Sequence, residues 1–220
     1  MSTVLIIGAG PNIGLATAKA FASAGYKVAL ASRSKITDAY KHFPFDAAKP
    51  DTVHQLFEGV RKEVGDPKVV IYNAAAWTQT PPETPFALSL DEYRKSSDVN
   101  TTSVFVAAKE AVDGFARTGP GSTFIFTGNL LNVRPGPRSV AFGIGKAGSA
   151  NLIKAASTSF DGKGYKFYYV DERKSDGANV YPTGAEAHAN TFLELARDDK
   201  QRAWQYTFVD GKGYVDFNER

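Results

Sequence analysis

Short runs of apolar residues alternate along the chain with longer stretches in which apolar residues recur at a helical period. The apolar runs predict β-strands at Val4–Ile7, Lys27–Ala31, His42–Phe45, Lys68–Tyr72, Ser122–Thr127, Lys166–Val170 and Trp204–Val209. The stretches between them predict helices at Ile13–Ala24, Asp51–Val64, Leu90–Ala116, Ser139–Ser159 and Gly184–Arg197. Because strands alternate with helices, the pattern predicts an α/β fold in which βαβ units build a parallel sheet.

The chain has no feature that divides it into separate domains. The predicted strands are hydrophobic throughout, which is typical of a sheet covered by helices on both faces. We find no internal repeat, low-complexity tract or Gly/Ser linker. We therefore expect residues 1–220 to form a single-domain Rossmann-type fold, a doubly wound parallel sheet of about seven strands. Ligands bind such sheets at the carboxyl ends of the strands, so the proline-rich loops Thr80–Pro85 and Val133–Pro137 are expected to frame a pocket.

Composition and charge narrow the classes of function. The 26 basic and 23 acidic side chains are interleaved and sum to +3, so nucleic acid is not the expected partner. Zero cysteines exclude disulfides and thiolate chemistry, and three scattered histidines predict no metal centre. No apolar run reaches the roughly 18 residues that span a bilayer, and the first strand begins too early to leave a leader. We therefore expect a cytoplasmic protein without membrane association.

A glycine-rich turn, Ile7-Gly-Ala-Gly-Pro-Asn-Ile-Gly14, joins the first strand to the first helix. Such turns let the backbone approach a pyrophosphate at the helix N-terminus, which makes Gly8, Gly10, Asn12, Ile13 and Gly14 candidate cofactor-binding residues. The turn resembles the Gly-x-x-x-Gly-x-Gly motif of the short-chain dehydrogenase/reductase family, with Asn12 at the middle glycine. Asparagine tolerates a positive φ, so we expect the exchange to preserve the turn. The alternative is a tight turn that binds no ligand.

The end of the second strand indicates which dinucleotide the chain prefers. Sites that prefer NAD carry an acidic residue there to hold the ribose 2′-hydroxyl, whereas this chain has Ser32, Arg33 and Ser34, followed by Lys35. A guanidinium can fork onto a 2′-phosphate that a carboxylate would repel. We therefore expect NADP(H) to be preferred over NAD(H). The alternative is a solvated basic turn.

The resemblance to the family continues through the cofactor half of the chain. Phe45-Asp-Ala47 matches the family's segment after the third strand, which implies that Asp46 and Ala47 border the adenine. Tyr72-Asn-Ala-Ala75 is similar to the family's Asn-Asn-Ala-Gly run after the fourth strand, and it implies cofactor contacts by Asn73, Ala74 and Ala75.

The catalytic half departs from the family's pattern. The active-site Tyr-x-x-x-Lys reads here as Phe142-Gly-Ile-Gly-Lys146, and the serine thirteen positions before the tyrosine reads as Asn129. The resemblance implies that Asn100 holds a water of the proton relay and that Lys146 binds the nicotinamide ribose. Phenylalanine has no proton to give, and losing a general acid typically costs ~10²–10⁴-fold in rate, or roughly 3–5 kcal/mol.

Replacement proton donors are sought among polar side chains near the same strand ends. Thr127 is expected on the strand face of Asn129, where its hydroxyl can donate a hydrogen bond. Tyr168, Tyr169 and Asp171 fall where the family carries Pro-Gly, and the family's lid is shortened to Asp171–Pro182. The simpler interpretation makes the tyrosines core and rim aromatics and Asp171 a solvated residue.

Two functions of different classes remain open from the sequence. One is an NADP(H)-dependent oxidoreductase that acts on a carbonyl or hydroxyl of a small molecule with a rewired acid. The other is a degenerate member that binds the dinucleotide as a sensor, partner subunit or non-redox scaffold. The resemblance also implies a homodimer or homotetramer that associates through the helices predicted at Leu90–Ala116 and Ser139–Ser159.

Overall fold

Eight strands form one sheet in the order β3-β2-β1-β4-β5-β6-β7-β8. The computed structural model describes residues 1–217. The strands are β1 (Thr3–Ile7), β2 (Lys27–Ser32), β3 (Lys41–Pro44), β4 (Pro67–Tyr72), β5 (Thr123–Thr127), β6 (Lys166–Glu172), β7 (Gln205–Val209) and β8 (Gly213–Tyr214). The first seven are parallel, and β8 pairs antiparallel with β7. The predicted α/β fold with a doubly wound parallel sheet is confirmed, and the two-residue β8 is the strand that the apolar pattern missed.

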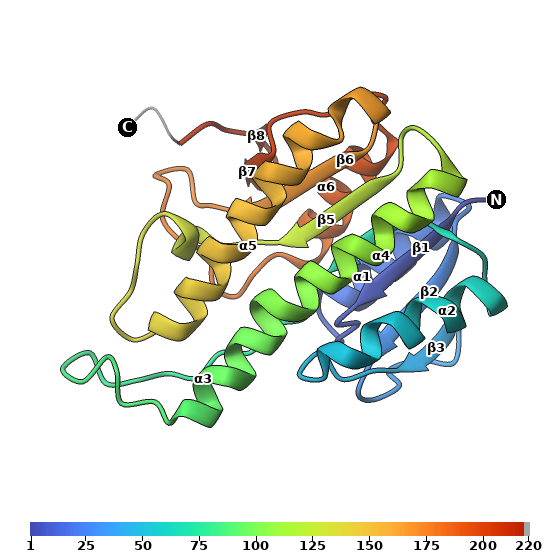
Figure 1. Ribbon diagram of the computed structural model, residues 1–220. Coiled ribbons are helices and arrows are strands. Elements are labelled where there is room, and N and C mark those ends of the chain that lie inside the picture. Colours follow the sequence, from blue (N-terminus) through green and yellow to red (C-terminus); the bar gives the residue numbers. More distant parts are fainter. Residues whose placement is uncertain (218–220) are drawn as a thin grey trace.

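Helices cover both faces of the sheet (Figure 1). They are α1 (Ile13–Ser23), α2 (Val53–Glu63), α3 (Leu90–Ser97), α4 (Ser103–Thr118), α5 (Val140–Ser159) and α6 (Ala185–Arg197), with short 3₁₀ turns at Pro50–Thr52, Leu130–Asn132 and Asp161–Lys163. Side chains alternate between the two faces of the sheet and so form two hydrophobic cores. Leu5 and Ile7 belong to the core covered by α2, α4 and α5. Val4 and Ile6 belong to the core covered by α1 and α6. Of the helices in residues 1–217, none is long and apolar enough to cross a membrane.

The helix predicted at Leu90–Ala116 is divided into two helices, which corrects the prediction. α3 begins with a capping box formed by Ser89 and Glu92, and it ends where one π-helical turn, Asp98–Thr102, leads into α4. A π turn inserts one extra residue and so changes the direction in which the side chains of that turn point. The turn contains Asn100, the polar residue that a regular helix interior disfavours.

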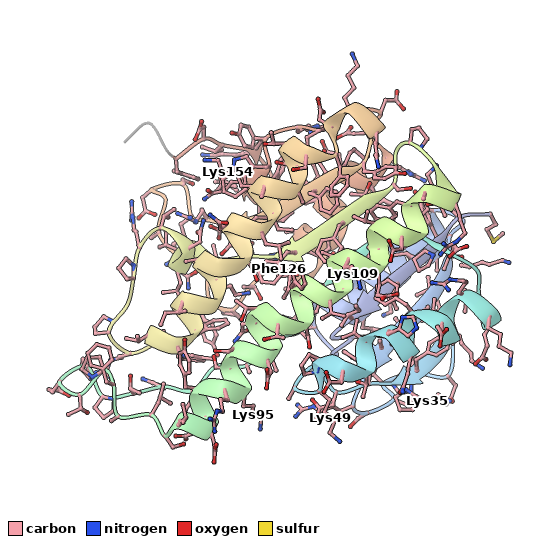
Figure 2. All side chains as sticks on the ribbon, viewed as in Figure 1. Lys35, Lys49, Lys95, Lys109, Phe126 and Lys154 are labelled. Atoms are coloured by element: carbon pink, nitrogen blue, oxygen red, sulfur yellow. The ribbon has the colours of Figure 1, made fainter. Side chains whose placement is uncertain are left out.

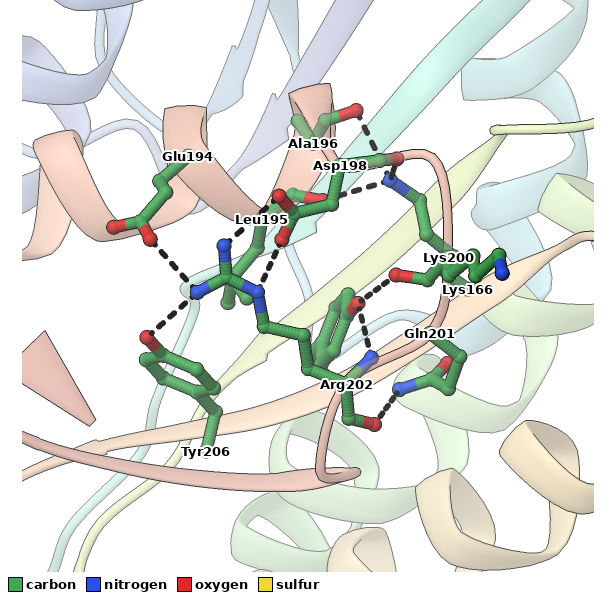
Figure 3. Close-up of polar contacts among 10 residues, drawn as sticks. Lys166, Glu194, Leu195, Ala196, Asp198, Lys200, Gln201, Arg202 and Tyr206 are labelled. Carbon is green, nitrogen blue, oxygen red and sulfur yellow. Dashed lines mark hydrogen bonds and ion pairs between the residues drawn. The ribbon is translucent and has the colours of Figure 1, made fainter. Parts of the chain in front are cut away.

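The carboxyl end of α6 is tied to the sheet by buried polar groups. Lys166 on β6 donates its ammonium protons to the carbonyl oxygens of Leu195 at 2.8 Å, Ala196 at 3.2 Å and Asp198 (Figure 3). These carbonyls lack partners within the helix, so the lysine acts as a C-terminal cap. The same figure shows Arg202 bound to Glu194 and Asp198 on the other side of the turn.

The connection between β6 and α6 is short, and hydrogen bonds hold its carboxyl-terminal end, at Gly184, to the strand. Arg173 pairs with Asn179 in a bridge, which folds residues 174–178 into a tight turn. Glu172 Oε2 accepts a hydrogen bond from Gly184 N at 2.7 Å, and the buried His188 contacts Gly184 O at 2.8 Å. The shortened segment predicted at Asp171–Pro182 therefore starts two residues later, because Asp171 and Glu172 belong to the strand.

Candidate functional site

A cavity of about 370 Å³ lies at the carboxyl ends of β1, β2 and β4. Ten of the residues predicted to bind the cofactor line it, which are Gly8, Gly10, Ser32, Arg33, Ser34, Asp46, Ala47, Asn73, Ala74 and Ala75. Its lining does not include Asn12, Ile13 or Gly14, nor the four residues predicted to be catalytic. The structure thus brings together the residues expected around the adenosine and the first phosphate, at the place where open α/β sheets bind ligands.

The glycine-rich turn owes its shape to two close backbone contacts. Gly8 has a φ of +83°, and a Cβ there would lie 2.3 Å from Ala74 N. Gly14 packs on Ala9, where a Cβ would come within 2.8 Å of Ala9 Cα. A Cβ on Gly10 would meet no atom within 4 Å, so this edge is open toward the cavity. Gly8 and Gly14 are therefore structural requirements, and Gly10 is the position where the backbone borders open space.

Asn12 does not use the positive φ that was expected to explain it. Its φ is −89°, and among residues 1–217 all positive φ angles belong to glycines. The reason is that Gly8 alone provides the left-handed residue of this turn. Asn12 is instead the exposed N-cap residue of α1, and its side chain makes no capping hydrogen bond. Leu15 N donates to Gly10 O at 3.0 Å, whereas the N–H groups of Ile13 and Gly14 have no side-chain cap from Asn12 and suit an anion, which the helix dipole also favours.

Asn73 connects three strands beneath the cavity. Its Nδ2 donates to Gly8 O at 3.0 Å, and its backbone N donates to Ile7 O at 2.8 Å. Its Oδ1 accepts a hydrogen bond of 2.9 Å from the Thr127 hydroxyl. The hydroxyl proton of Thr127 is thus engaged with Asn73, and β1, β4 and β5 are held in register at the cavity floor.

The loop after β2 presents one cation to the cavity without a counter-charge. Arg33 is exposed, lines the cavity and forms no ion pair with any residue in 1–217. Beside it, His42 Nε2 lies 3.0 Å from Ser32 Oγ and 3.1 Å from Ser32 O. Lys35, by contrast, is paired with Asp38. The guanidinium of Arg33 is therefore free to bind an anion.

Lys95 lines the same cavity from α3, and sequence reasoning missed it. Figure 2 shows Lys35, Lys49 and Lys95 along the lower edge of the molecule. The sequence around Lys95 gave no indication of this role, because a lysine in the last turn of an exposed helix usually points to solvent. Its contribution depends on how α3 packs beside the end of β4.

Asn100 fastens the loop that follows β4. Its amide donates from Nδ2 to Ala76 O at 2.7 Å and accepts from Ala76 N at 3.2 Å. Nδ2 also donates to Ser96 Oγ at 3.2 Å, and Asn100 O accepts a 2.6 Å hydrogen bond from Ser149 Oγ. Gly145 permits this packing, since a Cβ there would lie 2.5 Å from Asn100 Cβ. The side chain and the carbonyl of Asn100 therefore both have protein partners.

Lys146 lies on the buried face of α5, and aromatic rings surround its side chain. It is 3% exposed, and its ammonium donates to Thr127 O at 2.7 Å. The Nζ atom is 4.4 Å from the centre of the Phe126 ring and 5.1 Å from that of Phe142. Burial lowers the pKa of Lys146 to about 7, although the charge of Asp171 acts in the opposite direction.

The side-chain amide of Asn129 forms a hydrogen bond with the backbone two residues further along the chain. Its Oδ1 accepts from Leu131 N at 3.0 Å and so caps the turn Leu130–Asn132, while the Tyr169 hydroxyl donates to Asn129 O at 2.7 Å. The Tyr169 ring fits against Gly128, where a Cβ would lie 2.1 Å from the ring. Thr127 ends β5, so Asn129 follows the strand rather than sharing its face as expected.

The two tyrosines of β6 are confirmed as core residues, and the interpretation of Asp171 as solvated is wrong. Tyr168 and Tyr169 are completely buried, and burial holds the pKa of Tyr169 well above its usual value. Asp171 is 1% exposed and forms an ion pair with Arg173, which is itself buried. Arg173 supplies the counter-charge that lets a carboxylate remain inside. The Asp-x-Arg spacing at the end of an apolar strand is the signal that could have indicated this pair.

Comparison with known proteins agrees with this geometry. A sequence profile described as short chain dehydrogenase matches residues 2–171. The chain is 42% identical over 231 aligned residues to the short chain dehydrogenase/reductase dmxR12 of Cryptosporiopsis sp. (strain 8999), covering 97% of this chain and 94% of that protein. The chain belongs to the short-chain dehydrogenase/reductase family. Glucose 1-dehydrogenase of Gluconobacter oxydans is 26% identical, over 81% of this chain and 70% of its own length.

Solved structures of this dehydrogenase/reductase fold superpose along nearly the whole chain. The 4-hydroxyisoleucine dehydrogenase complexed with NADH has a TM-score of 0.81 at 16% identity, covering 96% of this chain and 98% of that one. ElxO with NADP bound has a TM-score of 0.80 at 17% identity over the same shares. At these identities the superpositions show the fold. The first of these proteins was solved with NADH and the second with NADP.

Proposed function

We propose that this member of the oxidoreductase family binds NADP(H) in preference to NAD(H) and reduces a carbonyl, or oxidises a hydroxyl, of a small organic substrate. The observation that carries the proposal is Arg33, an unpaired guanidinium in the cavity at the end of β2. It stands where a site for NAD would carry a carboxylate. A bidentate guanidinium binds a phosphate group more strongly than a hydroxyl, so the extra phosphate of NADP(H) is the group it distinguishes.

The residues around the cavity fit a dinucleotide phosphate. The uncapped N-terminus of α1 and the open edge at Gly10 suit the pyrophosphate, and Arg33 with Ser32 and Ser34 suits the 2′-phosphate. Asp46 and Ala47 would border the adenine, and Lys146 would hold the nicotinamide ribose, as the family resemblance implies. When bound, the cofactor supplies or accepts the hydride.

In our proposal, the proton donor of this site differs from the tyrosine that the family uses. Phe142 takes the place of the family's phenol and Asn129 the place of its serine, and neither donates a proton near neutral pH. Asn100 holds the loop at Ala76 beside the cofactor, and it is assigned here to positioning. The proton then comes from water, from the ribose relay or from another side chain.

Titration of cofactor fluorescence tests the cofactor assignment. We expect Arg33→Ala to weaken NADPH binding roughly 10–100-fold, as expected for the loss of charge-assisted hydrogen bonds, and to change NADH binding less than about threefold. Arg197→Ala, an exposed arginine on α6 away from the cavity, is the matched control. Equal affinities of the wild-type protein for NADPH and NADH would contradict our interpretation of Arg33.

A second function is favoured by one specific observation at the same site. The Lys146 ammonium is buried on Thr127 O beside the Phe142 ring, so no phenol is present for it to activate. A member that binds the dinucleotide without a redox step, as a sensor, partner subunit or non-redox scaffold, fits this arrangement. A panel of ketones and aldehydes monitored for loss of NADPH separates the two functions, because only the oxidoreductase consumes NADPH.

We also propose that the protein forms a homodimer or homotetramer through α4 and α5. Phe105 on α4 is 61% exposed and Ile144 on α5 is 48% exposed, so both helices present apolar side chains outward. Burial of such side chains in a subunit interface removes apolar surface from water. Light scattering should give the mass of an oligomer, and Phe105→Glu should reduce it. A monomeric wild-type protein would refute this assignment.

A further inference from the structure

Three charged side chains are buried together beneath the start of α5. Lys146, Asp171 and Arg173 are each 3% exposed or less. The Lys146 ammonium lies beside the rings of Phe126 and Phe142, and Tyr169 packs on Phe126. Figure 2 labels Phe126 in the interior between α4 and α5. Charges in such surroundings persist only when they are paired, because each loses its hydration.

Strand register places Asp171 on the side of the sheet that carries Lys146. The carbonyl of Thr127 accepts a hydrogen bond from the Lys146 ammonium. Thr127 on β5 is the register partner of Val170 on β6. Side chains alternate along a strand, so Asp171 shares a face with Tyr169, which belongs to the core under α5. The carboxylate on β6 and the ammonium on α5 therefore lie on the same side of the sheet.

The two oxygens of Asp171 have different environments. Oδ2 accepts from the guanidinium of Arg173, whereas Oδ1 is buried and has no hydrogen-bond partner among residues 1–217. Arg173 is directed away from α5, since its Nη1 donates to Gly177 O at 3.3 Å and its Cζ lies 6.0 Å from the Phe217 ring. One acceptor of the carboxylate is thus left over in a region whose other charged group is Lys146.

Among residues 1–217, no other group near the pair offers a negative charge to Lys146. Glu172 points to the opposite face of β6 and binds Gly184, and Tyr169 donates its proton to Asn129 O. Tyr72 on β4, stacked on Phe126 at 5.9 Å, donates to Val99 O. β5, the strand between them, has no ionisable residue. Asp171 and Lys146 act on each other in both directions, each favouring the charged form of the other.

We propose that Asp171 is a positioning residue that keeps Lys146 protonated, and that it thereby sets the pH range in which the site binds NADPH. The inference rests on the proposed function for its cofactor, and on this chain alone for its electrostatics. In the family's usual site, a tyrosine phenol lies beside the lysine and its ionisation is coupled to that of the ammonium. Phe142 has no ionisable group, so this coupling is missing here. The carboxylate of Asp171 is the group that opposes the desolvation of the ammonium. Without it, the Lys146 ammonium would be buried with no opposite charge near it among residues 1–217.

The test is the pH dependence of the NADPH dissociation constant, measured by fluorescence between about pH 5 and pH 9. In the wild-type protein, binding should weaken as the pH rises through the pKa of Lys146, about 7. In Asp171→Asn the midpoint should move roughly one to two pH units lower, because the supporting charge is gone. Asp66→Asn, which also removes a carboxylate paired with arginines, is the matched control and should leave the midpoint unchanged.

Two further variants keep the test decisive. In Lys146→Arg the side chain stays charged throughout this range, so the transition near pH 7 should disappear, and adding Asp171→Asn should not restore it. If Asp171→Asn does not fold, Arg173→Met is measured instead. Arg173 favours the charged form of Asp171, so its removal should leave Asp171 neutral over more of this pH range and move the midpoint downward, as Asp171→Asn does. Superimposable profiles of the folded variants and the wild-type protein would overturn the proposal.

Nuclear magnetic resonance of labelled lysines separates this inference from the proposed function. The Lys146 signal is assigned by its loss in Lys146→Arg, and its titration is followed without any cofactor. A protein that does not bind NADPH, but in which Asp171→Asn lowers the titration midpoint of Lys146, would refute the cofactor assignment and retain the electrostatic coupling. A midpoint unaffected by both Asp171→Asn and Arg173→Met would refute the coupling itself.

Discussion

Replacing Asn100 by alanine tests how the π turn supports the cofactor loop. The substitution removes three hydrogen bonds of the buried amide, at 2.7 Å to Ala76 O, 3.2 Å from Ala76 N and 3.2 Å to Ser96 Oγ. At about 1 kcal/mol for each neutral hydrogen bond, the sum is ~3 kcal/mol. Ala76 is only half-buried, so water partly replaces the lost partner. We expect the free energy of unfolding to fall by about 2–3 kcal/mol.

Urea denaturation followed by tryptophan fluorescence measures this change, with an unchanged m-value as the condition for comparing variants. Ser96→Ala is the matched control, because it removes one of the three hydrogen bonds and should cost about 1 kcal/mol. Ala76 lines the cavity, so Asn100→Ala should also weaken NADPH binding. An unfolding free energy within about 0.5 kcal/mol of the wild-type value, a range typical of surface substitutions, would refute the reasoning.

Three further predictions concern the acid, the glycine turn and a surface ion pair. Phe142→Tyr should raise ketone reduction by ~10²–10⁴-fold, measured as NADPH consumption against the exposed control Phe105→Tyr, and no gain would favour the non-redox function. Gly8→Ala should destabilise the protein by at least about 2 kcal/mol in urea, because its φ is +83° and its Cβ would meet Ala74 N; a neutral result would contradict the close contact. Hydrogen bonding to Arg117 lowers the pKa of Asp66 below 3.8, so the stability advantage of wild type over Asp66→Asn should be complete above that pH and vanish as the pH falls through the folded-state pKa. A pH-independent difference between these two proteins would contradict the ion-pair assignment.

The fold and the residues that line the cavity were predictable because both depend on local pattern. Apolar runs located the seven parallel strands, and the turn containing Gly8 and Gly10 lies between a strand and a helix as expected. The carboxyl-edge rule then placed Arg33 and Asn73 around one cavity, although they are far apart in the sequence.

The remaining features of the site depend on contacts between distant segments. A continuous helical period ran through Asn100, and the π turn arises because its amide pairs with Ala76 from another loop. Asp171 looked solvated because an isolated carboxylate at a strand end usually is, and its burial follows from Arg173 and from α5 above it. The π turn has no period or motif that a single sequence displays, and the sequence indicates the burial of Asp171 only through its spacing from Arg173 at the end of a strand.

The fastening of Gly184 to Glu172 bears on how molecules enter and leave. A segment anchored at both ends cannot sweep across the mouth of the site, and this one has only the stretch between Arg173 and Gly184 to move. In enzymes that close a flap over their substrate, the motion of the flap often limits the rate of turnover. We therefore expect binding and release to proceed without a closing step by this segment, so that selectivity rests on the fixed walls of the cavity rather than on enclosure.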